Sequence, residues 1–382
     1  MRACATSEIP CSLEGGASAT ERESGLHSQV KESRFELVDF LRGFAIVEML
    51  AAHYATFLPH VAQRFIGYSE TAMALFVLLA GLMVGWSYQK FARSPRSESW
   101  VMWRRALRVL AVQYLMILTL GVPFQLLGLP GARSGQPLST FVLQSMLLLN
   151  QISLLHILPT FIPLFAMSPA VLYALARSWD VGLLLVSLAL FCLGHFSPHL
   201  LDLGGEPTIF PFILFQLYFV VGCLLGKRTR LTGRLPPRQP QKWLVASCGL
   251  VIATLLLVHG RVVPSGLIST HPLNLVGLAY HVPIIATVWL GSMVFAPTIE
   301  RLWVYPYITR FGRHALLVFV IHVYLAKALS ALNHLTTPPA WLNLVLIAAS
   351  VVVMNALVRR YELSRAREPP PLWTAGLGGL FK

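Results

Sequence analysis

One apolar stretch of the sequence carries four ionisable residues, Asp39, Arg42, Glu48 and His53. At about 100° per residue, Arg42 and His53 share one helix face and lie about 16 Å apart along the axis. Asp39 can pair with Arg42, and Gly43 lets a neighbouring helix or ligand approach the backbone closely. Ionisable groups inside a membrane are costly, so each is a candidate site residue. The alternatives are a snorkelling Asp39–Arg42 ion pair and an interfacial His53.

Three arginines stand at the start of another apolar stretch, in the segment Trp103-Arg104-Arg105-Ala-Leu-Arg108. Spacings of three and four residues let all three arginines face one side of a helix. Guanidinium groups bind phosphate in a bidentate manner, so the cluster suits a phosphorylated ligand. The alternative is ordinary anchoring of a helix end by positive charge.

Further polar side chains occur within or beside apolar stretches, where each is either a site residue or a bridge between helices. Although Glu48 points away from His53 on a helix, it is kept among the site candidates. The five cysteines show no CxxC spacing, so neither a zinc site nor a disulfide framework is expected. The site candidates of this kind are Glu48, Asn150, His156, His281 and His322.

The composition is that of an all-α integral membrane protein. The chain has 382 residues, is 55% hydrophobic and 12% charged, and has a mean hydropathy of +0.65. Soluble domains carry about 25% charged residues, and a bilayer core is crossed by about 20 apolar residues. A bundle of about ten transmembrane helices is therefore expected. The predicted spans are Phe35–Leu58, Thr71–Tyr88, Val109–Leu127, Leu154–Leu175, Val181–Leu193, Phe210–Gly226, Trp243–Val258, Leu273–Phe295, Ala315–Leu332 and Ala340–Val358.

The distribution of positive charge predicts the direction of this bundle. With both termini in the cytoplasm, cytoplasmic segments hold 25 of the 30 Lys and Arg residues, in accord with the positive-inside rule. This distribution accounts for the net charge of +14 without nucleic acid as a partner. His53, like Asn150, His156 and His281, then lies toward the external side, His322 nearer mid-membrane, and the arginine cluster at the cytoplasmic boundary.

Three parts of the chain are expected. Residues 1–34 are polar and are predicted to be a disordered cytoplasmic tail. Residues 35–361 form the transmembrane domain, and residues 362–382 form a second cytoplasmic tail. Within the domain, Thr140–Leu149 is too short to cross alone and is predicted to be re-entrant or interfacial.

The order of these motifs resembles the membrane-bound acyltransferase-3 superfamily. Its first-helix signature, an arginine, ten residues and a histidine, is matched by Arg42 and His53. The segment Leu75-Phe-Val-Leu-Leu-Ala80-Gly81 is similar to its second-helix element, and Arg105-x-x-Arg108 to its third. Three other stretches extend the resemblance over residues 35–361, the first two pointing to the OpgC branch: Leu154-Leu-His156-Ile-Leu158-Pro159-Thr160-Phe161, Phe210 through Gly222, and Gly312 through His322.

The resemblance implies a multi-pass O-acyltransferase of the bacterial inner membrane. It would move an acetyl or succinyl group from cytoplasmic acyl-CoA to a hydroxyl of an exported or periplasmic glycan, with no permanently bound cofactor and no metal. It implies His53 as general base or transient acyl carrier, since an unperturbed histidine titrates near neutral pH. Arg42, held by Asp39, would orient the thioester or hold a CoA group at depth. The residues that would line the acceptor or acyl pocket are Glu48, Asn150, His156, His281 and His322. The residues that would bind the CoA phosphates are Arg104, Arg105 and Arg108.

Some residues depart from the family pattern. Ala80 stands where serine is usual, and His314-Ala315 replaces a more usual polar-Ser pair. Lys327 is a candidate cation for the extra carboxylate of a succinyl donor. The rival function is a secondary transporter or flippase with Arg42 and His53 in a relay, but matching broken half-repeats are not found. A scaffold whose polar residues join helices is a second rival.

Overall fold

The computed structural model describes residues 19–55, 57, 71–129, 136–149, 154–155, 157–197, 212–233, 235, 237, 239–259, 275–336 and 338–367. Across these ranges the chain forms helices and no strand, as expected where lipid cannot hydrogen-bond the backbone. Two compact units are present, Met1–Glu36 and Leu37–Lys382. The first unit contains the start of α1 (Ala19–Ala55). Residues 19–34 of this helix belong to the segment predicted to be a disordered polar tail. The second unit holds all the features below.

Within the described part of the chain, eight helical segments are long and apolar enough to cross a membrane. Each coincides with a span predicted from the sequence, which confirms an all-α, multi-span protein. The segments are α3 (Ala72–Trp86) with α4 (Tyr88–Arg93), α5 (Pro95–Met116) with the π-helical η1 (Ile117–Gly121) and α6 (Val122–Leu126), α8 (Ile157–Ala176), α10 (Phe212–Thr232), α11 (Pro240–His259), α12 (Leu275–Val294), α15 (Ala315–Thr336) and α16 (Ala340–Arg367).

Two further helices match the remaining predicted spans. α9 (Asp180–Phe196) is apolar but has 17 residues, and α1 carries three charged residues in its apolar part. The total of ten crossings and the cytoplasmic position of both termini therefore stay predictions. The short segment expected near residue 140 is α7 (Leu138–Met146), whose nine residues cannot span a bilayer. Two other short helices are α13 (Ala296–Ile299) and α14 (Tyr305–Arg313).

Helices α3 and α10 pack with their backbones in close contact. Four glycines, two spaced by four residues on each helix, form this contact: Gly81 and Gly85 on α3, and Gly222 and Gly226 on α10. A Cβ atom on any of them would overlap a backbone carbonyl oxygen of the opposite helix. Lipid supplies no hydrophobic force between helices, so association depends on such close packing of small residues.

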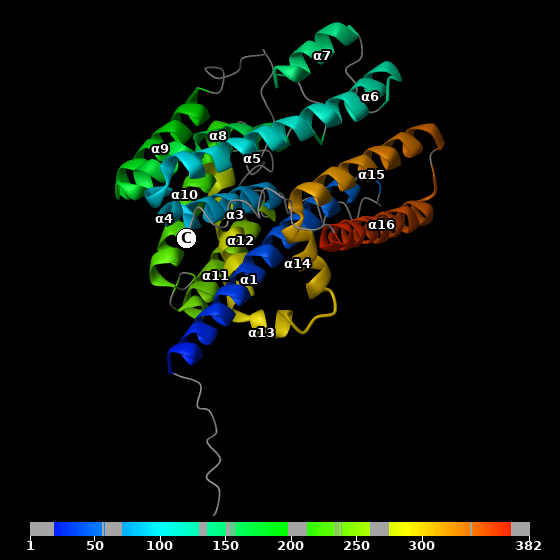
Figure 1. Ribbon diagram of the computed structural model, residues 1–382. Coiled ribbons are helices and arrows are strands. Elements are labelled where there is room, and N and C mark those ends of the chain that lie inside the picture. The colour runs from blue at the N-terminus through cyan, green and yellow to red at the C-terminus, as the bar shows by residue number, and fades with distance from the viewer. Residues whose placement is uncertain are drawn as a thin grey trace, which may run out of the picture. The chain divides into compact units, whose positions relative to one another are not determined.

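A second close contact joins α1 to α14. A Cβ on Gly43 would overlap the carbonyl oxygen of Ile308, and one on Gly312 would overlap the carbonyl oxygen of Asp39. The close approach expected at Gly43 is therefore made by a helix. On the same side of the bundle α16 lies alongside α15 (Figure 1). The end of α1 is tied to α16, since Ser350 Oγ donates to the Tyr54 hydroxyl at 2.9 Å.

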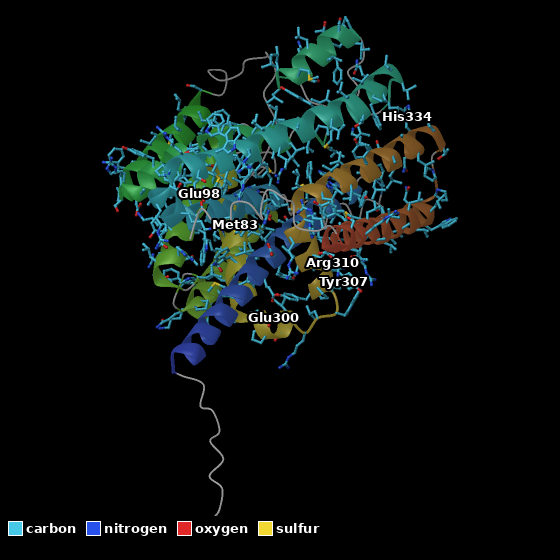
Figure 2. All side chains as sticks on the ribbon, in the orientation of Figure 1. Met83, Glu98, Glu300, Tyr307, Arg310 and His334 are labelled. Atoms are coloured by element: carbon cyan, nitrogen blue, oxygen red, sulfur yellow. The ribbon has the colours of Figure 1, made fainter. Side chains whose placement is uncertain are left out.

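Polar and apolar side chains are distributed as a membrane protein requires. Glu98 lies in the first turn of α5 and His334 in the last turn of α15 (Figure 2). On α11, by contrast, Val245 and Leu256 are more than two-thirds exposed, at 74% and 68%. Such exposed apolar surface is stable only against lipid or another protein. The polar groups buried inside the bundle are the ones that need a functional explanation.

Candidate active site

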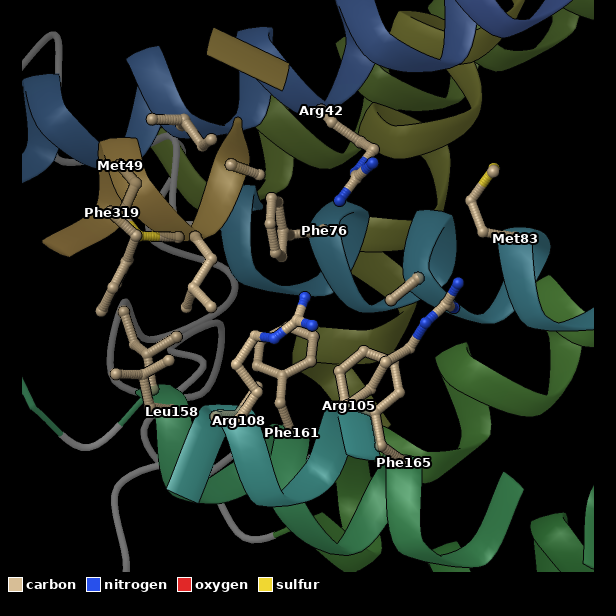
Figure 3. A pocket seen from close by; sticks show the side chains of 16 residues that line it. Arg42, Met49, Phe76, Met83, Arg105, Arg108, Leu158, Phe161, Phe165 and Phe319 are labelled. Atoms are coloured by element: carbon tan, nitrogen blue, oxygen red, sulfur yellow. The ribbon is translucent and has the colours of Figure 1, made fainter. Parts of the chain in front are cut away.

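A pocket of about 280 Å³ opens among α1, α3, α5, α8 and α15. Arg42 projects into it from α1 toward Arg105 and Arg108 of α5 (Figure 3). No acidic side chain occurs among the described residues of its lining, so the pocket suits an anion. Four aromatic rings form part of the apolar wall: Phe76, Phe161, Phe165 and Phe319.

Asp39 holds Arg42 beside the pocket, as the three-residue spacing predicts. Its carboxylate lies 3.7 Å from Arg42 Nη1 and, on the opposite oxygen, 3.6 Å from Arg313 Nε of α14. The Arg42 guanidinium also lies over the ring of Phe76, 5.8 Å from its centroid. One carboxylate thus faces two guanidiniums, while Arg105 adds a third charge that acts on Arg42. The cluster keeps an excess of positive charge.

The three clustered arginines of α5 do not all line the pocket. Arg105 and Arg108 line the pocket, whereas the guanidinium of Arg104 lies over Trp100, 5.9 Å from the ring centroid. A rotation of about 100° per residue turns Arg104 away from its neighbour. The spacing alone allowed all three to face one ligand, and only the packing of α5 against α8 selects two of them.

His53 and His322 meet where α1 passes α15. His53 Nδ1 lies 2.9 Å from His322 Nε2, with the two rings nearly parallel at an interplanar angle of 10°. His322 is completely buried and packs against the edge of Phe319, with the ring centroids 5.1 Å apart. The sequence placed these two histidines at different depths, and the structure brings them into contact.

The histidine pair lies directly beyond the pocket. Met49 on α1 and Phe319 on α15 both line the pocket, and each precedes its histidine by one helical turn. Four residues of helix span about 6 Å, so His53 lies about one helical turn beyond the pocket lining, of which neither histidine is part. The helix face that Arg42 and His53 are predicted to share therefore follows one wall of the pocket and continues past it.

Two other candidates occupy different places. Glu48 accepts hydrogen bonds from the backbone N–H of Thr71 at 3.1 Å and from its hydroxyl at 2.7 Å. This ties α1 to the start of α3, away from the pocket lining. His281 is buried in α12 against Tyr280, and α12 contributes no described residue to the pocket. Asn150 and His156 lie outside the described residues.

Lys327 is a buried cation of α15 whose charge acts on the histidine pair. Its ammonium lies 5.1 Å from the ring centroid of Phe124, and the histidine on which its charge acts is His53. The sequence pointed to Lys327 only as a candidate cation near an acyl group. Its position relative to His53 required the fold.

A family model described as OpgC protein matches residues 34–366. The chain belongs to the OpgC protein family. Membership indicates a membrane O-acyltransferase that modifies glycans, in agreement with the resemblance of the motifs. Neither a search of curated proteins nor a search of solved structures gives a match.

Two of the three residues that depart from the pattern the sequence resembles fall on the pocket, while His314 is not among its lining residues. Ala80 of α3 and Ala315 of α15 are among its lining residues. An alanine offers a methyl group where a serine would offer a hydroxyl, so this wall has two fewer hydrogen-bonding groups. The pocket is therefore apolar at both positions.

Proposed function

We propose that this protein transfers an acyl group, acetyl or succinyl, from cytoplasmic acyl-CoA to a hydroxyl of an exported or periplasmic glycan, in the bacterial inner membrane. The observation that carries this proposal is one pocket that joins three guanidiniums to an aromatic wall and ends one helical turn from two histidines. CoA combines phosphate groups with an adenine ring and an apolar arm. Arginines suit the phosphates, and aromatic rings suit the rest.

Each group has a role in this proposal. Arg105 and Arg108 bind phosphate groups of CoA, and Arg42, held by Asp39, lies deeper and directs the thioester. His53 removes the proton from the acceptor hydroxyl as its oxygen attacks the thioester carbonyl. The tetrahedral intermediate then expels the CoA thiolate, which takes the proton from His53. A transient acyl-His53 intermediate is the alternative route to the same products.

The test is transfer by the purified protein in lipid vesicles. Labelled acyl-CoA and a glycan acceptor should give free CoA thiol and a glycan heavier by one acyl group, measured by mass spectrometry. His53→Ala should abolish both signals while the melting temperature of the protein stays within a few degrees. Movement of a substrate across the vesicle with the acyl-CoA left intact would favour the transporter instead.

A further inference from the structure

The two histidines face each other through different ring atoms. The contact joins Nδ1 of His53 to Nε2 of His322. Two neutral imidazoles can share such a contact only if one nitrogen carries the proton and the other a lone pair. If the proton sits on Nδ1 of His53, then its other nitrogen, Nε2, is basic. The opposite arrangement makes Nε2 the protonated atom and removes the base.

The proposed role of His53 as the base requires the first arrangement, in which His322 Nε2 supplies the lone pair of the 2.9 Å contact. The neutral ring of His322 then carries its own proton on Nδ1. That Nδ1 is buried and makes no hydrogen bond of ordinary geometry with a described residue, so no other described group competes for the ring.

His322 is also too enclosed to meet a substrate itself. It has no exposed surface, and Phe319 stands between it and the pocket. The charged side chain that acts on His53 from α15 is Lys327, while Glu48 of α1 is bonded to Thr71. His322 can therefore act on the reaction through His53 and not by direct contact.

We infer that His322 is a positioning residue, whose Nε2 accepts a hydrogen bond from His53 Nδ1–H and so keeps His53 Nε2 as the basic atom. The inference rests on the proposed function and deepens it. The acceptor O–H bond breaks and its proton moves to His53 Nε2 as the new C–O bond forms. The C–S bond then breaks, and the proton passes to the CoA sulfur. During the intermediate, His322 stabilises the imidazolium of His53 without taking a proton away.

The experiment compares His322→Leu with His322→Gln in the transfer assay. Leucine removes the acceptor, whereas the amide oxygen of glutamine can reach the place of Nε2 and cannot titrate in its stead. His322→Leu should lower kcat about 100-fold with the KM for acyl-CoA changed less than about twofold, within the range that general-base catalysis supplies. His322→Gln should recover about tenfold of that loss. Both should move the acidic limb of the kcat profile against pH.

His195→Leu is the matched control, because His195 stacks on Phe191 of α9 outside the pocket lining and should leave kcat unchanged. Wild-type kcat and pH profile in His322→Leu, with His53→Ala inactive, would overturn the inference and leave the proposed function standing. Activity retained in His53→Ala would overturn both. Equal loss in the two His322 variants with an unshifted pH profile would mean a merely structural role. If His322→Leu does not fold, the pH profile of His322→Gln decides.

Discussion

The division among the arginines of α5 makes a quantitative prediction about ligand binding. Arg105→Gln and Arg108→Gln each remove one guanidinium from the pocket, while Arg104→Gln removes one that lies over Trp100 outside it. A hydrogen bond to a charged group contributes about 1.5–3 kcal/mol when buried. Arg105 and Arg108 are exposed at the mouth of the pocket, so solvent screening reduces this to about 1–2 kcal/mol.

That energy corresponds to a Kd for CoA about 5- to 30-fold weaker in either pocket variant. Arg104→Gln, which removes the same charge from the same helix, should change Kd by less than about twofold. Calorimetric titration of CoA into the detergent-solubilised protein measures all three. Removing the 3′-phosphate from CoA should weaken binding to wild type more than to whichever pocket variant has lost its partner arginine.

Equal weakening by all three substitutions would refute the geometric reasoning, since it would mean that net charge alone attracts the ligand. Wild-type affinity in both Arg105→Gln and Arg108→Gln would remove the pocket as the CoA site. A rise from low to high salt should weaken binding to wild type and to Arg104→Gln alike, because both keep the pocket charge.

Three further outcomes follow from the packing and the pocket lining. Gly222→Ala should destabilise the protein by about 1–3 kcal/mol, seen as a lower melting temperature in detergent, because its Cβ would overlap an α3 carbonyl; Gly249→Ala, with nothing within 4 Å, should not. Lys327→Met should lower turnover of succinyl-CoA more than that of acetyl-CoA if its ammonium pairs with the succinyl carboxylate, and equal losses would exclude that pairing. Ala80→Ser should keep the fold and change the ratio of the two turnovers, and an unchanged ratio would separate position 80 from acyl selection.

Much of the fold could be predicted because a bilayer demands a long apolar run for each crossing. The span predicted from Ala315 to Leu332 corresponds to α15, which ends four residues later at Thr336. The third predicted span began at Val109, whereas α5 begins at Pro95. Hydropathy predicts the apolar part of a helix. It does not predict the polar turns by which the same helix continues into water.

In the candidate site, too, contacts within one helix could be predicted from the sequence, whereas contacts between distant helices could not. The alignment of Arg42 with His53 and the pairing of Asp39 with Arg42 follow from helical periodicity within α1. The Asp39–Arg42 contact is present in the structure, and the pocket lining follows the same helix through Arg42, Ile46 and Met49, one turn short of His53. The contact of His53 with His322 joins residues 269 positions apart. No local period can encode such a contact.

The sequence by itself determined the apolar helices and the face of α1 that carries Asp39, Arg42 and His53, and it predicts the gathering of positive charge at one end of the bundle. The tertiary structure alone decided which arginines of α5 face the pocket and which histidine meets His53. The reason is that periodicity defines the faces of a helix but not the direction in which each face points. That direction is set by contacts between helices, such as those of Gly43 with α14 and of Gly222 with α3.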